Sequence, residues 1–148
     1  MDRPHSADQL IQQYLNNNAF TRLLGFEFSF LEPGVVTYSL NVKALHLATP
    51  GFMHGGVSAT LLDATMGAGA MTLVADEGMV VSTIEMHINF LRPSLIGQRI
   101  MAKSEVVRKG QNVIFMKATL YDENHVKLAL SNGTFFPFSA VKAGYKIN

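Results

Sequence analysis

The sequence predicts an α+β fold in which a curved antiparallel sheet wraps around one central helix, with an extra helix at the N-terminus. Two observations support this. One helix-length run, residues 54–74, holds a single charged residue, Asp63, among apolar, small and hydroxylic residues. Segments of alternating apolar residues precede and follow it at hairpin spacing, which is typical of an antiparallel sheet. A helix without a solvent face must be covered on nearly all sides, and a curved sheet provides such cover.

The elements before the central run are a helix and a hairpin. Ser6 followed three residues later by Gln9 resembles a capping box, and the next apolar residues repeat at helical spacing. We therefore expect one N-terminal helix that ends near Leu24. Residues 26–30 and 36–42 both alternate in polarity around a Glu-Pro-Gly turn, so they predict a hairpin with one buried face.

Four strands are expected after the central run. Period-two segments cover residues 84–90, 100–108, 112–121 and 126–136, separated by turn-forming residues. The final ten or so residues are expected to be loose. No repeat or linker interrupts the pattern, and 148 residues fit one domain, so residues 1–148 are interpreted as a single unit.

Composition excludes several classes of function. The net charge is +1 and there is no basic run, so a nucleic-acid partner is not expected. Because cysteine is absent, disulfides, thiol nucleophiles and thiolate metal sites are excluded, which fits a reducing compartment. The polar N-terminus does not resemble a secretory leader and no stretch is apolar enough to span a membrane. We therefore expect a cytoplasmic protein without a membrane partner.

Asp63 is the residue of the central helix that most needs an explanation. A carboxylate in an enclosed helix must be paired, protonated or held for chemistry, and no Lys or Arg lies within two turns of it in the sequence. Gly67 and Gly69 each cost about 1 kcal/mol relative to Ala in a helix, which suggests that another backbone passes close by. A homodimer would cover the rest of the helix, and its small residues would permit close approach. They are Ala64, Gly67, Ala68 and Ala70.

Three segments of the chain match a known family pattern. They are PGFMHGGVSATLLDATMG, STIEMHINFLRP and VVRKGQNVIFMKATLYDEN. In the first, His54-Gly55-Gly56 is followed by an acid nine positions after the histidine, and the second ends on Phe90-x-x-Pro93. Over roughly residues 24–136 the chain resembles the hotdog-fold acyl-CoA thioesterases of the phenylacetate-degradation, or PaaI-like, type.

The resemblance implies hydrolysis of acyl-CoA thioesters without a cofactor. Asp63 would be the general base or nucleophile, and the Gly55 N–H would polarise the thioester carbonyl. His54 would shape the turn, and the Thr83 hydroxyl would lie near the attacking water. The segment 108–113 would hold the nucleotide part of coenzyme A. The expected substrate-binding residues are Gly56, Glu85, Phe90, Arg108, Lys109, Gly110, Gln111, Asn112 and Val113.

One position departs from the family pattern. Members often have asparagine six positions before the histidine, where it helps to place substrate or water, whereas this chain has Ala48. Either the polar neighbours His46 and Thr49 compensate, or turnover is slower or lost.

Helix geometry adds an inference that is independent of the family. Gly55 and Asp63 are eight residues apart, which is roughly 12 Å along one helix. A thioester carbon must lie about 3 to 3.5 Å from its attacker, and its oxygen about 3 Å from the oxyanion donor. One chain cannot place both groups on the same carbonyl. Two antiparallel central helices could, which predicts two shared sites in a functional dimer; we also expect dimers to pair into a tetramer.

Other functions remain open at this stage. A hotdog hydratase or dehydratase would also use an acid on the central helix, usually with a catalytic histidine opposite it. A non-catalytic acyl-CoA sensor is compatible with Ala48. A metal site is not expected, because the five histidines show no paired helical spacing, and no G-x-S-x-G motif indicates a serine hydrolase.

Overall fold

The computed structural model describes residues 5–147. Its helices are α1 (His5–Asn17), α2 (Ala19–Leu24) and α3 (Gly55–Thr72), with 3₁₀ turns at Ala44–His46 and Ala75–Glu77. Its strands are β1 (Glu27–Glu32), β2 (Val35–Asn41), β3 (Leu47–Thr49), β4 (Phe52–Met53), β5 (Met79–Phe90), β6 (Arg99–Lys109), β7 (Ile114–Tyr121) and β8 (Lys127–Ser139).

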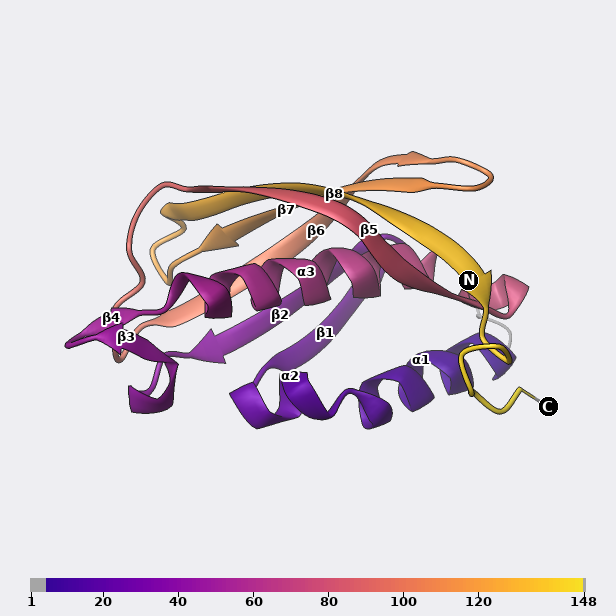
Figure 1. Ribbon diagram of the computed structural model, residues 1–148, viewed down its shortest axis with the longest axis horizontal. Helices are drawn as coiled ribbons and strands as arrows, with labels where there is room; N and C mark the ends of the chain where they lie inside the picture. The colour runs from indigo at the N-terminus through magenta and orange to yellow at the C-terminus, as the bar shows by residue number, and fades with distance from the viewer. Residues whose placement is uncertain (1–4, 148) are drawn as a thin grey trace.

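Six strands form one antiparallel sheet in the order β1-β2-β6-β7-β8-β5, and β3 pairs with β4 in a small separate ribbon. The large sheet curves around α3, which lies along its concave side (Figure 1). The predicted α+β architecture is therefore confirmed. None of the described helices is long and apolar enough to cross a membrane.

The core lies between α3 and the concave face of the sheet. Alternation along β2, β6, β7 and β8 sends every second side chain inward, where it meets the apolar side chains of the helix. Leu61, Leu62 and Met66 of α3 are completely buried. Their largest fully buried partners from the sheet are Tyr38, Leu40, Ile100, Ile114, Met116, Leu120 and Phe135.

Buried hydroxyls fasten the C-terminal half of α3 to the β1–β2 turn. Thr72 Oγ1 accepts a hydrogen bond from Gly34 N at 2.8 Å and donates to Gly69 O at 2.7 Å. Ser104 Oγ on β6 donates to Gly34 O at 2.9 Å. At Gly69 a Cβ would lie 3.0 Å from the Gly34 carbonyl oxygen and 2.6 Å from Ser104 Oγ, so the predicted close backbone approach is confirmed there.

The N-terminal region is a broken helix rather than the single helix that we predicted. Asn18 leaves helical geometry at φ −81° and ψ 78°, and its side-chain oxygen caps α2 by accepting from Thr21 N at 3.2 Å. The break redirects the chain, and α1 packs beside α3 on a cluster that includes Met71 of α3, Val80 of β5 and Ala140 after β8 (Figure 1). The four small residues of α3 are therefore buried within their own chain, and they do not form an open surface for a partner.

The last described residues pack against α1, whereas we expected them to be loose. β8 continues to Ser139, Ala140 is completely buried against α1, and Tyr145 packs on the same cluster. Gln13 of α1 exchanges two hydrogen bonds with the Lys146 backbone, at 2.7 and 3.2 Å. The segment is held because α1 offers both an apolar face and an amide side chain.

Candidate active site

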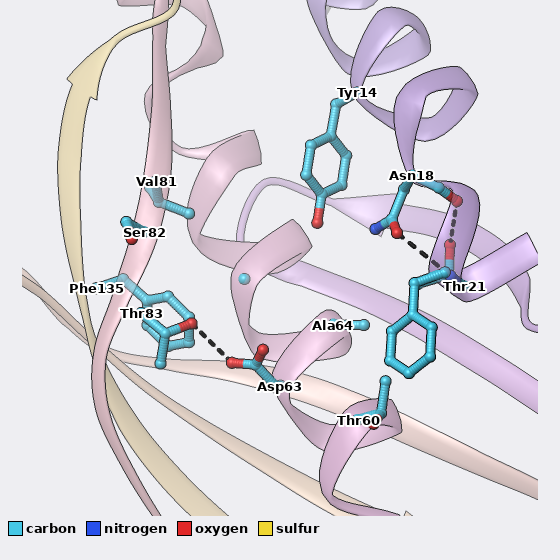
Figure 2. Close-up of a pocket in the computed structure, with 12 residues that line it drawn as sticks. Tyr14, Asn18, Thr21, Thr60, Asp63, Ala64, Val81, Ser82, Thr83 and Phe135 are labelled. Carbon is cyan, nitrogen blue, oxygen red and sulfur yellow. Dashed lines mark hydrogen bonds between the residues drawn. The ribbon is translucent and has the colours of Figure 1, made fainter. Parts of the chain in front are cut away.

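A cavity of about 310 Å³ opens between α3, the edge strand β5 and the α1–α2 pair. Figure 2 shows Asp63 and Thr83 on one side of it, with Tyr14 and Asn18 on the other. Its lining residues are Tyr14, Asn18, Phe20, Thr21, Thr60, Asp63, Ala64, Gly67, Val81, Ser82, Thr83 and Phe135. Because residues of α1, α2, α3, β5 and β8 meet here, the cavity is a product of the tertiary fold.

Asp63 lies at the middle of α3 and is half-buried at the cavity wall. Its Oδ1 accepts a hydrogen bond from Thr83 Oγ1 at 2.7 Å, and the other carboxylate oxygen points away from Thr83 (Figure 2). No ion pair neutralises Asp63 within residues 5–147. The carboxylate is thus oriented by one neutral donor and keeps an oxygen for a reacting group.

Thr83 faces Asp63 because β5 contains a bulge. Thr83 pairs with Phe135, whose side chain is fully buried, but the register shifts and Glu85 pairs with Thr134. Glu85 Oε1 accepts from Thr134 Oγ1 at 3.3 Å on the outer face of the sheet. Simple alternation would place Glu85 on the same face as Thr83, but the bulge turns it outward, so this expected substrate-binding residue is not brought to Asp63 in the same chain.

The N-terminus of α3 is built by His54. His54 is the N-cap residue, and its Nδ1 accepts from Gly56 N at 2.7 Å. A Cβ at Gly56 would lie 2.8 Å from that nitrogen, so glycine there lets the cap form, and its N–H is occupied. Gly55 is exposed, and as the first helical residue it has no intrahelical acceptor for its N–H. A Cβ at Gly55 would lie 3.5 Å from the ring of Phe90.

His46 has a structural role close to Ala48, the position at which the chain departs from the family pattern. It is buried; its Nδ1 accepts from Lys43 N at 2.9 Å and its Nε2 donates to Leu24 O at 2.8 Å. Both ring nitrogens are therefore engaged, and His46 cannot replace the family asparagine without losing one of these bonds. Ala48 and Thr49 are exposed in β3, where Thr49 remains the available polar neighbour.

The segment expected to hold the nucleotide lies at the opposite end of α3 from Gly55. Lys109 Nζ donates to Leu73 O at 3.0 Å and pairs with Glu77 at 2.7 Å, so it closes the C-terminal end of the helix. Because of these contacts, Lys109 is not a free phosphate ligand in this structure. Arg108, Gln111 and Asn112 are exposed, Gly110 N donates to Val113 O at 2.9 Å, and Gly110 and Val113 are half-buried.

Tyr14 and Asn18 are cavity residues that the sequence did not reveal. Tyr14 stands at a helical position that periodicity assigns to the apolar face. The pKa of Tyr14 is raised to about 12, chiefly by burial and to a lesser extent by electrostatic interaction with Tyr145 and Asp63. A hydrogen bond from Asn18 acts in the opposite direction. The run of three asparagines at 16–18, typical of a helix end, was the one available indication of Asn18. Among residues 5–147, no three His, Asp or Glu side chains gather as a metal site.

Comparison with known proteins gives a family match over the central helix and most of the sheet. Residues 50–129, more than half of the chain, match the family model described as "Thioesterase superfamily". The chain is 27% identical over 125 residues to acyl-coenzyme A thioesterase 13 of Homo sapiens, covering 83% of this chain and 87% of that protein.

Solved structures show the same fold. The PaaI protein of E. coli, from the phenylacetic acid degradation operon, superposes with a TM-score of 0.84 at 21% identity, covering 93% of this chain and 97% of its own. A Streptococcus mutans protein solved bound to acetyl CoA gives 0.71 at 23% identity, covering 78% and 90%. With a central helix wrapped by an antiparallel sheet and a family match across both, this chain belongs to the thioesterase superfamily and has the hotdog fold that the PaaI protein also has.

Proposed function

We propose that the protein hydrolyses acyl-CoA thioesters to a free acid and coenzyme A, in the cytoplasm and as a homo-oligomer. The observation that supports this most directly is the Asp63 carboxylate, held by Thr83 at the wall of a cavity and paired with no cation in the described chain. The names of the relatives agree with this chemistry: acyl-coenzyme A thioesterase 13 is one, and the Streptococcus mutans neighbour was solved with acetyl CoA.

The reaction needs a base or nucleophile and a donor for the oxyanion. With Asp63 as the base, a water oxygen bonds to the thioester carbon while its proton passes to the carboxylate. The carbonyl oxygen becomes an oxyanion, which a Gly55 N–H at a helix N-terminus stabilises. The C–S bond then breaks, and coenzyme A leaves as a thiolate that takes up a proton. If Asp63 is instead the nucleophile, water resolves an acyl-enzyme anhydride, and the other roles are unchanged.

The Gly55 donor comes from the partner subunit in this proposal. The Gly55 N–H and the Asp63 carboxylate both belong to α3 and are eight residues apart. This corresponds to roughly 12 Å along the helix, which is too far for both to act on one carbonyl. Within the described chain β5 pairs only with β8, so twelve residues of strand keep an open edge beside the site. Exposed apolar side chains continue this surface toward the N-terminus of α3. They are Phe52, Ile84, Phe90, Leu91, Leu95 and Ile96.

Replacing the carboxylate tests the chemistry. Asp63→Asn keeps the size of the side chain and its bond to Thr83 but removes the base, so kcat for thiol release should fall by about 100-fold or more. Thiol release from acyl-CoA, followed with a thiol reagent, measures it. Asp76→Asn, an exposed acid after α3, is the matched control and should retain wild-type turnover. Equal turnover of Asp63→Asn and wild type would contradict the role given to Asp63.

The shared site is tested by mixing two inactive chains. Gly55→Pro removes the N–H, and proline suits the first position of a helix; His54 already has φ −64° and ψ 132°, which a following proline favours. Refolded together with Asp63→Asn, it forms mixed dimers with one intact site, so activity should recover to about one quarter of the wild-type value. Size-exclusion chromatography with light scattering establishes the oligomer. If the mixture stays inactive while dimers form, the site is not shared.

The two rival functions give different products. A hydratase leaves the thioester intact, and a sensor binds acyl-CoA without releasing thiol. The matching family model and acyl-coenzyme A thioesterase 13 are both named for thioester hydrolysis, so the hydrolase is the function that the site and the comparisons support best.

A further inference from the structure

The wall of the cavity that faces Asp63 comes from the N-terminal helices. Tyr14 of α1 and Asn18 at the break lie across the cavity from the carboxylate (Figure 2), and Phe20 of α2 also lines the cavity. The volume of about 310 Å³ lies at the low end of the range of roughly 300 to 1,000 Å³ that is usual for small-molecule sites. An acyl group whose carbonyl lies at Asp63 therefore meets this wall after a short distance.

The wall is fixed rather than mobile at Tyr14. Its ring packs on two apolar clusters at once, the core beneath α3 and the cluster of Ala7, Leu10 and Met71. A tyrosine hydroxyl is neutral near pH 7, so Tyr14 offers a group that can donate one hydrogen bond. The ring closes the cavity and the hydroxyl gives that end a polar character.

Asn18 adds a second donor at the same end. Its side-chain oxygen accepts from Thr21 N at 3.2 Å and its amide group hydrogen-bonds the Tyr14 hydroxyl, which leaves one amide hydrogen and the Tyr14 hydroxyl hydrogen for a ligand. Figure 2 shows that nitrogen on the side of Tyr14. The end of the cavity opposite Asp63 thus combines a rigid aromatic ring with two polar hydrogens.

We propose that Tyr14 and Asn18 select the acyl group: a short chain whose far end bears a hydrogen-bond acceptor such as a hydroxyl or keto oxygen. A long unbranched alkyl chain is excluded by the Tyr14 ring, and a short alkyl chain leaves both donors without a partner when it displaces water. This inference rests on the proposed hydrolysis and adds the class of substrate.

The substrate profile of the wild-type protein is the first measurement. We expect kcat/KM for thiol release to be at least about 10-fold higher for 4-hydroxybutyryl-CoA than for butyryl-CoA, and to fall by at least about 10-fold from butyryl-CoA to palmitoyl-CoA. No thiol from any acyl-CoA would overturn the proposed function itself. Equal rates on all these thioesters would leave the hydrolase in place and overturn the selection by Tyr14 and Asn18.

Three variants separate size from hydrogen bonding. Tyr14→Phe keeps the ring, so it should lose the hydroxyacyl preference and retain the length limit. Tyr14→Ala opens the wall and should raise the palmitoyl-to-butyryl ratio by about 10-fold. Asn18→Ser preserves a helix cap but shortens the donor, and should reduce the hydroxyacyl preference. Tyr121→Phe, outside the cavity, is the control and should keep the wild-type profile.

A change on the opposite wall supplies an independent check that does not depend on the packing of Tyr14. At Gly67 a Cβ would have only the Phe135 ring within 4 Å, at 3.5 Å, so Gly67→Ala fits and takes volume from the cavity. It should lower kcat/KM for hexanoyl-CoA more than for acetyl-CoA. A uniform effect of Gly67→Ala and Tyr14→Phe on every acyl group would overturn the proposal.

Discussion

The hydroxyl of Tyr38 is buried on β2 and has no hydrogen-bond partner among the described residues. Its ring is well placed, edge-on to Phe28 with centroids 5.3 Å apart. A buried hydroxyl without a partner costs about 1 to 3 kcal/mol. Tyr38→Phe should therefore raise the free energy of unfolding by about 1 kcal/mol, as measured by urea denaturation. Tyr121→Phe is the comparison, and a less stable Tyr38→Phe protein would show that the hydroxyl is satisfied.

At the residue scale, the sequence was informative wherever one residue type stands out from its surroundings. Asp63 is noticeable because its helix is otherwise uncharged, and the His-Gly-Gly run was informative because an acid follows nine positions after its histidine. Lys109 could not be placed, because a lysine in a hairpin has the same local pattern whether it meets a phosphate or Glu77. Tyr14 could not be placed because periodicity identifies an apolar face but not the cavity beside it.

The two glycines of α3 give a matched prediction at the scale of an element. Gly69→Ala places a Cβ 3.0 Å from the Gly34 carbonyl oxygen and 2.9 Å from the Met116 methyl group, so the β1–β2 turn must shift. We expect a loss of about 1 to 3 kcal/mol in stability. Gly67→Ala meets no such contact and should gain up to about 1 kcal/mol from helix propensity. Thermal melting of both variants measures the contrast, and equal melting temperatures would contradict it.

Element order was predictable because α3 and the long strands impose their periods over many residues. Changes of backbone conformation at a single residue were not predictable. The break at Asn18 and the bulge after Thr83 each change one backbone conformation, yet they redirect everything that follows. The bulge reverses the alternation of β5, so Glu85 reaches the outer face although simple counting places it with Thr83.

For the whole molecule, three tyrosines predict a loss of stability at alkaline pH. Burial raises the pKa of Tyr14 to about 12, and it also raises the pKa of Tyr38 and of Tyr145. Between about pH 10 and pH 12 the unfolded chain has released phenol protons that the folded chain retains, so stability falls as the pH rises. Urea denaturation across this range measures the slope. Tyr14→Phe should flatten it, by up to about 2 kcal/mol at the upper limit, and an unchanged slope would contradict the prediction.

The shape of the whole was the most predictable level, because an uncharged helix flanked by hairpins has few arrangements that cover it. Our prediction for the side of α3 that the sheet does not cover differed from the structure. We expected a partner chain there, whereas α1, α2 and the segment after β8 supply it. The sequence could not show this, since amphipathic helices cover their own fold and partner surfaces with the same pattern.

The two ends of α3 differ in how they are held, because the hydroxyls of Thr72 and Ser104 stabilise only its C-terminal half. They fasten its last turns to the β1–β2 turn, whereas residues 55–60, apart from the buried Ser58, are exposed or half-buried and adjoin the strand at the open edge of the sheet. Amide hydrogens of the final turns should therefore exchange with deuterium most slowly, and protection should decline steadily toward residue 57. We therefore expect a bound ligand to displace the N-terminal turn of α3 more readily than its C-terminal turns.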